Sequence, residues 1–176
     1  TFSNNLDEML FSIGLRQLLA HPKVIDLNSQ YILLNDLLLD TTQVKIVMGK
    51  KEVTAEKAEE VVDSAVAAKW KVLGNSIKLN NINFAMDDEN APRQPYGMVY
   101  AHLDVRNLVL DLEQLLYTTD TIAGNLKQLS VKEKRGFDLQ KFTTQFAYYP
   151  QGAYLNNLYL QTSNNILQDK LVVKYP

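Results

Sequence analysis

The chain has 176 residues, of which 46% are hydrophobic and 22% are charged, proportions that are ordinary for a folded, soluble protein. Its 18 Lys and Arg residues nearly balance its 20 Asp and Glu residues, and the net charge of −2 argues against a nucleic-acid binder or a protein held on membranes by clustered cations. The absence of cysteine excludes disulfides and thiolate metal sites.

Neither a membrane span nor a signal peptide is visible in the sequence. No apolar run approaches the roughly 20 residues that a spanning helix needs, and the opening residues Thr1–Asn5 have neither a basic nor an apolar region. We therefore expect the chain to be an excised or processed piece of a longer protein, with any anchor or export signal outside it.

Residues 1–51 predict an N-terminal group of strands. Ile32–Leu39 has apolar residues at every second position on either side of a doubled polar pair, Asn35 and Asp36, which shifts this period-two pattern by one residue. Ile13–Leu18 is a looser copy of the same pattern. A plain alternating strand follows at Val44–Met48.

Residues 52–70 predict a helical crossover. Apolar residues recur there with helical spacing up to Trp70, Thr54 is a suitable N-cap, and Glu56 lies in the opening turn. This amphipathic helix would either pack on the sheet as a simple crossover, which we favour, or lie as a plug along an exposed apolar groove.

Residues 71–176 predict a C-terminal β-sheet region, continuous with the rest of the chain. The pattern with the doubled polar pair recurs at Ile77–Phe84, Leu103–Leu110 and Ala153–Leu160, and more loosely at Leu126–Val131 and Phe137–Phe142. The last strand is expected at Leu171–Tyr175. Such recurrence indicates an array of similar strands.

Turn residues separate these units. The longest connection is Asp87–Gly97, and the short connections at Gly124, Gly136, Gly152 and Asn164 are typical of antiparallel neighbours. Glu113–Tyr117 is either a weak helical stretch or the end of the strand before it.

The doubled polar residues carry the central prediction. They shift the alternation by one residue, which in a flat strand would move the following apolar side chains to the opposite face. A β-bulge takes up one extra residue, restores the face and bends the strand, and Asn and Asp tolerate the backbone angles that it needs. We therefore predict a mainly β fold: a curved, taco-like or groove-like, largely antiparallel sheet of long bulged strands with one amphipathic helix. A closed sandwich or barrel is the alternative.

The apolar residues of the four clearest units would line the inside of this bent sheet as one groove. These candidates are Ile32, Leu34, Leu37, Leu39, Ile77, Leu79, Ile82, Phe84, Leu103, Val105, Leu108, Leu110, Leu155, Leu158 and Leu160.

Residues for catalysis do not converge in the sequence. His21 and His102 have no companions at metal-ligand spacing, and we expect His102 and Asp104 to form a surface pair. Asp87–Asn90 lacks the spaced ligands of a calcium loop, and the other acidic pairs resemble solvated loops or helix faces. We expect no enzyme, no cofactor, no metal and no catalytic residue.

Three stretches resemble one known family. Tyr100–Leu108, Thr118–Leu126 and Leu129–Phe137 are similar to the AsmA-like/TamB (translocation and assembly module) proteins of Gram-negative envelopes. The most specific parts are Asp-Thr-Ile-x-Gly-x-Leu at 120–126 and Leu-Ser-x-Lys-Glu-Lys-x-Gly at 129–136. The likeness covers most of the chain apart from the expected helix.

This resemblance implies a non-enzymatic module for lipid transport and outer-membrane biogenesis in the cell envelope. Members of the family are anchored in the inner membrane and cross the periplasm as a taco-shaped sheet whose apolar β-groove is thought to carry phospholipids or to assist outer-membrane assembly. The implied partners are phospholipids or other acyl chains, an outer-membrane assembly protein and the remainder of the same chain, and no nucleic acid. The alternative is a structural or adhesive β-solenoid or surface-binding domain without lipid cargo.

Overall fold

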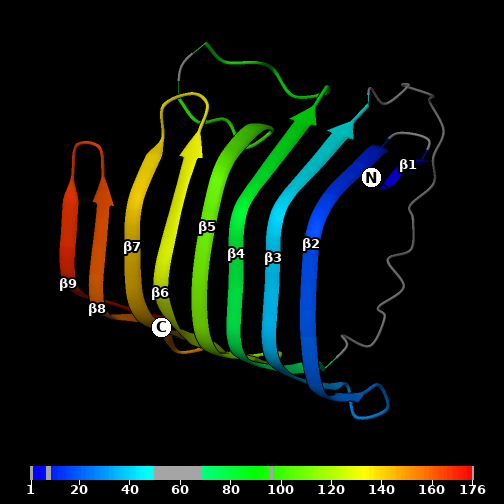
Figure 1. The fold of residues 1–176 in the computed structure, drawn as a ribbon. Coiled ribbons are helices and arrows are strands. Elements are labelled where there is room, and N and C mark those ends of the chain that lie inside the picture. The colour runs from blue at the N-terminus through cyan, green and yellow to red at the C-terminus, as the bar shows by residue number, and fades with distance from the viewer. Residues whose placement is uncertain (1, 7–8, 50–68, 96, 176) are drawn as a thin grey trace, which may run out of the picture.

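A computed structural model describes residues 2–6, 9–49, 69–95 and 97–175 (Figure 1). Nine strands account for most of them: β1 (Phe2–Leu6), β2 (Met9–Asp26), β3 (Tyr31–Met48), β4 (Lys71–Asp88), β5 (His102–Tyr117), β6 (Ile122–Glu133), β7 (Asp138–Tyr149), β8 (Gly152–Thr162) and β9 (Ile166–Lys174). The prediction of a mainly β protein is confirmed.

All nine strands form one sheet in the order of the chain, from β1 to β9. Neighbours are antiparallel except for β3 and β4, which run parallel. The sheet is therefore mixed, and its parallel pair needs a crossover connection in place of a hairpin. Because β1 and β9 are its two edges, the sheet is open, and the alternative of a closed sandwich or barrel is wrong.

The structure does not support the predicted amphipathic helix. Most of it falls on residues 52–68, which lie outside the described residues, and its last two residues, Lys69 and Trp70, have no regular structure. The weaker helical alternative at Glu113–Tyr117 is wrong, because these residues are the end of β5. In the part of the chain that the structure describes, no helix is long and apolar enough to cross a membrane.

The doubled polar residues are bulges, as predicted. Asn81, Asn107 and Asn157, each the second residue of its pair, have left-handed backbone angles with φ of 53°, 50° and 51°. The pairing of β4 with β5 shifts between Leu79 and Ile82, and the other two bulges lie beside similar shifts. Asn adopts this backbone region more readily than most residues, because its short side chain can bond locally.

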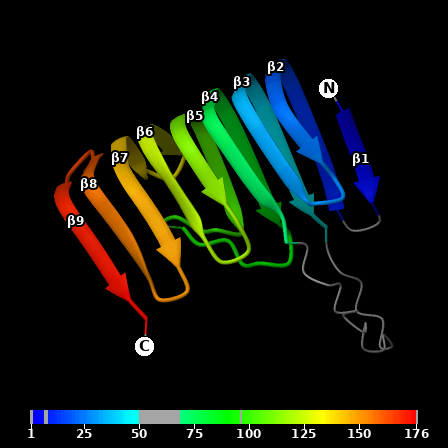
Figure 2. The same cartoon turned by 90° about the horizontal axis from the view of Figure 1, so that it is seen from below.

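The long strands are strongly bent. In Figure 2, the middle of each long strand lies on the side that faces the viewer in Figure 1. Both ends of the strand lie on the opposite side. Bulges increase the local bend of a strand. The sheet is consequently convex on the side that Figure 1 presents and concave behind it.

The connections confirm most of the expected turns. Gly136 has φ of 116° in the hairpin between β6 and β7, a conformation that favours glycine, and short connections also join β7 to β8 and β8 to β9. The expected turn at Gly124 is wrong, because Gly124 lies within β6. A Cβ there would lie 3.0 Å from Phe146 Cζ and 3.1 Å from Leu112 Cδ1, so the glycine makes room for two larger side chains.

Gly152 fixes the spacing of the last two strands. A Cβ at this position would lie 2.4 Å from the backbone oxygen of Val173, closer than any real contact. We expect Gly152→Ala to separate β8 from β9 and to lower the free energy of unfolding by about 1–3 kcal/mol, as overpacking generally does. Urea unfolding measures this loss. Gly14→Ala is the matched control, because its Cβ would have 3.9 Å of space and should leave stability nearly unchanged; equal losses in both variants would contradict the expectation.

Candidate functional site

The register of β4 and β5 decides on which face the apolar side chains lie. Leu79 pairs with Leu110, and Ile82 pairs with Leu108. Leu108 and Leu110 are two residues apart with regular alternation between them, so they point to the same side of the sheet. Leu79 and Ile82 therefore share that side although three positions separate them.

The neighbouring strand repeats this arrangement. Phe84 pairs with Val105 and Ile82 with Leu108, and the extra residue now lies in β5, at Arg106 and Asn107. Val105 and Leu108 thus lie on the same side as Ile82. The bulges preserve one continuous apolar face, which we call the inner face, and the opposite side is the outer face.

The register places every groove candidate on the inner face. Followed from strand to strand, it brings together Ile32, Leu34, Leu37 and Leu39 of β3, Ile77, Leu79, Ile82 and Phe84 of β4, Leu103, Val105, Leu108 and Leu110 of β5, and Leu155, Leu158 and Leu160 of β8. Between β2 and β8, the only charged residues that the register assigns to this face are Asp88 and Glu133, both at strand ends.

The candidate list missed the inner-face residues of β2, β6 and β7. Phe11, Ile13, Leu15 and Leu18 extend the face across β2, and Leu126, Leu129, Val131, Leu139, Phe142 and Phe146 connect β5 to β8. Their signal was present in the looser copies of the pattern. Those copies bulge at other residue pairs, such as Lys127 with Gln128 in β6, and so match the clearest units less closely.

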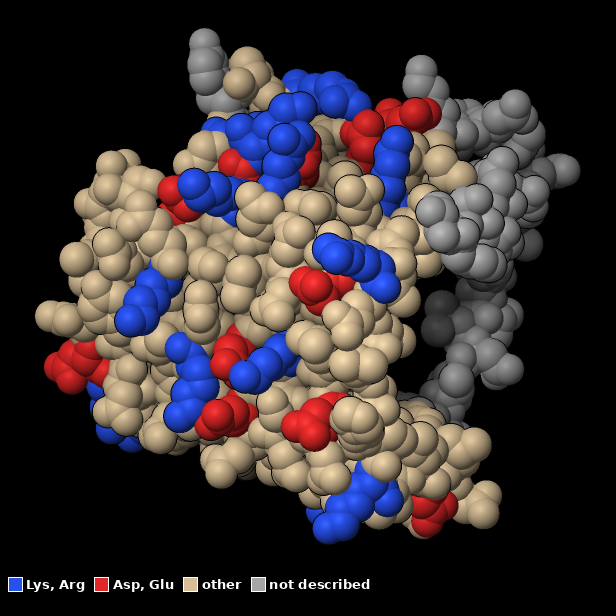
Figure 3. Space-filling model, viewed as in Figure 1, with Lys and Arg blue, Asp and Glu red and all other residues tan. Residues whose placement is uncertain are grey.

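The inner face is the concave side of the sheet. The buried apolar side chains, Ile82, Leu112, Leu126, Leu139 and Leu158, all belong to it, as expected where side chains converge on the inside of a bend. The convex side instead carries scattered acidic and basic side chains (Figure 3). Cross-strand ion pairs join residues that the register assigns to the outer face, such as Lys78 with Asp111 at 3.6 Å and Lys132 with Asp138 at 3.8 Å.

In the part of the chain that the structure describes, a single layer leaves much of this apolar face accessible. The chain has 12641 Å² of accessible surface at 20.0 kDa, whereas a compact protein of this mass has roughly 8,700 Å². Inner-face residues of β2 are widely exposed, with Leu15 at 44% and Leu18 at 52%. Soluble domains usually bury such a face against a second layer, and an uncovered one marks a binding surface.

The outer face holds one small charge network around Asp104. Its carboxylate accepts hydrogen bonds from Arg106 at 3.0 Å and lies 3.7 Å from the Lys134 ammonium. The hydrogen bond from Arg106, with the charges of Arg106 and Lys134, holds the pKa of Asp104 below its ordinary value of 3.8 although partial burial opposes the shift.

This network predicts a small, pH-dependent contribution to stability. A carboxylate whose pKa is lower in the folded state stabilises the fold above its unfolded pKa, and the contribution is lost as the pH falls through the folded pKa. We expect Asp104→Asn to cost less than about 1 kcal/mol near neutral pH, because the pair is partly exposed. Urea unfolding should give no difference between the variant and the native chain well below pH 3.8. A difference that persists in acid would contradict a charge effect.

A second polar cluster corrects the prediction for His102. The sequence suggested a surface pair with Asp104, but His102 is buried, and its Nδ1 lies 2.5 Å from Asp87 Oδ1. Asp87 also accepts two hydrogen bonds from Arg93. The hydrogen bond from His102 contributes most to lowering the pKa of Asp87, Arg93 adds to the effect, and burial opposes it. Both oxygens of the Asp87 carboxylate thus have partners within the protein.

Comparisons with known proteins return no relative of this chain. No protein-family model matches the chain, and neither a search of curated proteins nor one of solved structures returns a match. In the part of the chain that the structure describes, no group of three or more His, Asp or Glu side chains is placed to hold a metal ion. The accessible apolar inner face is the candidate functional site.

Proposed function

We propose that this chain is a lipid-handling module of a bacterial envelope, and that its inner face binds the acyl chains of phospholipids or related lipids. The observation that carries the proposal is the continuity of the inner face across β2 to β8, with charged residues only at strand ends. Binding, rather than catalysis, is the role that such a surface supports.

The energetics of acyl burial favour this occupant. Each methylene removed from water contributes about 0.8 kcal/mol, so about ten methylenes against the inner face would contribute about 8 kcal/mol before the entropy of binding is subtracted. Leucine, isoleucine, valine and phenylalanine offer no polar partner that would select one position along the chain. A lipid could therefore shift from strand to strand with little barrier, over the roughly 30 Å that the seven strands from β2 to β8 span.

The likeness to AsmA-like/TamB proteins supports the setting. On this proposal the chain works in the periplasm as part of a protein anchored in the inner membrane, with the remainder of that protein and an outer-membrane assembly protein as partners. Transport of phospholipid toward the outer membrane, or assistance in outer-membrane assembly, is then the process that the inner face would serve.

Lipid retained through purification tests the proposal. The chain is purified from bacterial envelopes without detergent exchange, and native mass spectrometry and lipid extraction identify bound molecules. We expect phospholipid or another acyl lipid in a defined ratio to protein. Folded protein without any lipid, also after incubation with vesicles, would contradict the proposal and favour the structural or adhesive alternative.

A further inference from the structure

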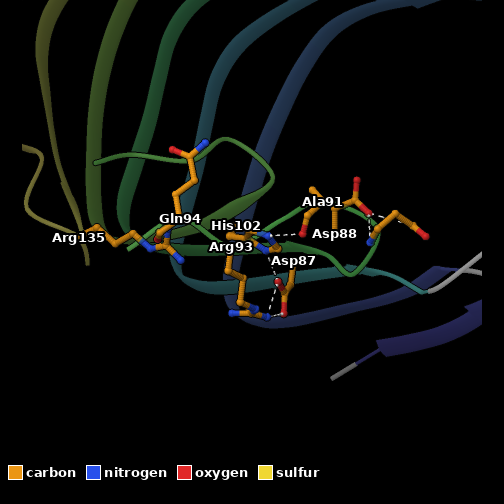
Figure 4. Close-up of polar contacts among 8 residues, drawn as sticks. Asp87, Asp88, Ala91, Arg93, Gln94, His102 and Arg135 are labelled. Carbon is orange, nitrogen blue, oxygen red and sulfur yellow. Dashed lines mark hydrogen bonds and ion pairs between the residues drawn. The ribbon is translucent and has the colours of Figure 1, made fainter. Parts of the chain in front are cut away.

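A short segment after β4, which we call the strap (Glu89–Pro95), is tied across the ends of the neighbouring strands (Figure 4). The Asn90 side chain donates to the backbone oxygen of Gly49 at 2.9 Å. The backbone oxygen of Ala91 lies 3.0 Å from His102 Nε2, and that of Gln94 accepts from Arg135 at 3.2 Å. Arg93 of the strap also donates two hydrogen bonds to Asp87, so the imidazole of His102 is one of several anchors and the one that holds Ala91.

Both nitrogens of this imidazole face acceptors. Nδ1 faces Asp87, whose lowered pKa keeps the carboxylate ionised, and Nε2 faces the carbonyl of Ala91. Neither partner can donate a hydrogen bond. Only an imidazole with protons on both nitrogens satisfies the two contacts together.

Loss of one proton would break the contact with the strap. The remaining proton would stay on Nδ1, beside the Asp87 carboxylate, and the lone pair of Nε2 would then face the Ala91 oxygen at 3.0 Å. Because only 3% of the His102 side chain is exposed, water cannot readily enter between the two atoms. Two buried acceptors in contact repel each other and leave both unsatisfied.

The charged groups around the imidazole belong to several elements. A pocket of about 500 Å³ beneath the strap is lined by Lys45 of β3, Asp87 of β4, Arg93 of the strap, His102 and Asp104 of β5, Glu133 of β6, and Lys134 and Arg135 of the following hairpin. Arg106 donates a hydrogen bond to the Asp104 carboxylate, and Lys134 forms an ion pair with it. The backbone N–H of Arg135 donates to Glu133. Asp87 is therefore the carboxylate that bonds the His102 ring in the described part of the molecule.

We infer that the contact between Ala91 and His102 is a proton-dependent latch over this pocket: it holds the middle of the strap while His102 carries two protons and opens when one is lost, while Asn90 and Arg93 keep the strap attached. The closed state belongs to the protonated imidazole, so it is favoured at low pH and lost as the pH rises.

Spin labels test the latch, because the chain has no native cysteine to remove. Cysteines replace the exposed Gln94 in the strap and the exposed Gln140 in β7, and the distance between their labels is measured by pulsed electron resonance. We expect one narrow distance distribution at about pH 5 and its loss to a broad one at about pH 8. Identical distributions at both pH values would overturn the inference.

Variants separate the latch from a general effect of pH. His102→Gln has one amide donor group and no charge, and should give the broad distribution at both pH values. His21→Gln is the matched control, because His21 is the other histidine of the chain and is exposed, and it should retain the full pH response. Loss of the pH response in His21→Gln would show that His21, and not His102, controls the strap.

A measurement on the unaltered chain keeps the test independent of folding defects. Nitrogen-15 spectra of the two imidazoles report how many protons each ring carries. We expect His102 to carry two protons at the lower pH and, once it has lost one, to keep the other on Nδ1 beside Asp87. A single proton on His102 at both pH values would refute the latch, whatever the outcome for lipid binding.

Discussion

Leu39→Glu should abolish lipid binding, whereas Leu38→Glu should leave it nearly unchanged. The two leucines are adjacent in β3 and both half-buried, but Leu39 pairs with Leu79 on the inner face, and Leu38 pairs with Lys78 on the outer face. A carboxylate against acyl chains is costly, since acidic and basic residues cost about 2.5–3.5 kcal/mol at the centre of a membrane helix. We therefore expect more than a tenfold loss of bound lipid in Leu39→Glu alone.

The adjacent position is a strict control. Both variants exchange the same residue types in the same strand, so their effects on solubility and net charge are equal. Lipid per protein, measured after identical purification, gives the comparison, and urea unfolding checks that both variants are folded. Equal loss of lipid in the two variants would remove the distinction between the faces on which the account depends.

Replacement of the three left-handed asparagines by valine should strongly reduce stability. Asn81, Asn107 and Asn157 have φ near 50°, which costs a β-branched residue roughly 1–2 kcal/mol. The positions belong to different strands and are exposed, so their effects should nearly add. The triple Val variant should lose about 3–6 kcal/mol, a large share of the 5–15 kcal/mol by which most domains are stable.

Each bulge supplies its own control. Asn156 precedes Asn157, is equally exposed and is not among the residues with positive φ. Asn156→Val should therefore change the free energy of unfolding by less than about 0.5 kcal/mol, and Asn157→Gly should be tolerated, since glycine adopts this region freely. Urea unfolding of the single and triple variants measures these differences. A similar cost at Asn156 and Asn157 would show that the loss comes from the side chain and not from the backbone.

The face of each long strand could be predicted because the bulge is a local event. A doubled polar pair shifts the alternation within a few residues, and the response of the backbone at Asn81 or Asn107 requires no knowledge of distant partners. The same logic explains the error at Glu113–Tyr117. Gln114 is another left-handed residue with φ of 55°, so adjacent apolar residues there reflect a bulged strand where the sequence also allowed a helix.

Long-range contacts were not predictable from one sequence. The parallel pairing of β3 with β4 depends on the connection between them, and alternation carries no information on strand direction. His102 alternates onto the outer face and was expected at the surface, but the strap, through Ala91 and Arg93, lies against this region. The turn at Gly124 was predicted from the residue type alone. Glycine in a strand can also mark a close approach of neighbouring side chains, as it does here.

Photo-crosslinking at two adjacent residues of β5 shows which face of the sheet contacts lipid. A benzophenone amino acid replaces Leu110 on the inner face or Val109 on the outer face, both half-buried, and the chain is irradiated in bacterial envelopes. We expect a covalent adduct with the mass of an acyl lipid at position 110 and none at position 109. Adducts at neither position, or equal amounts at both, would contradict an inner face that holds acyl chains.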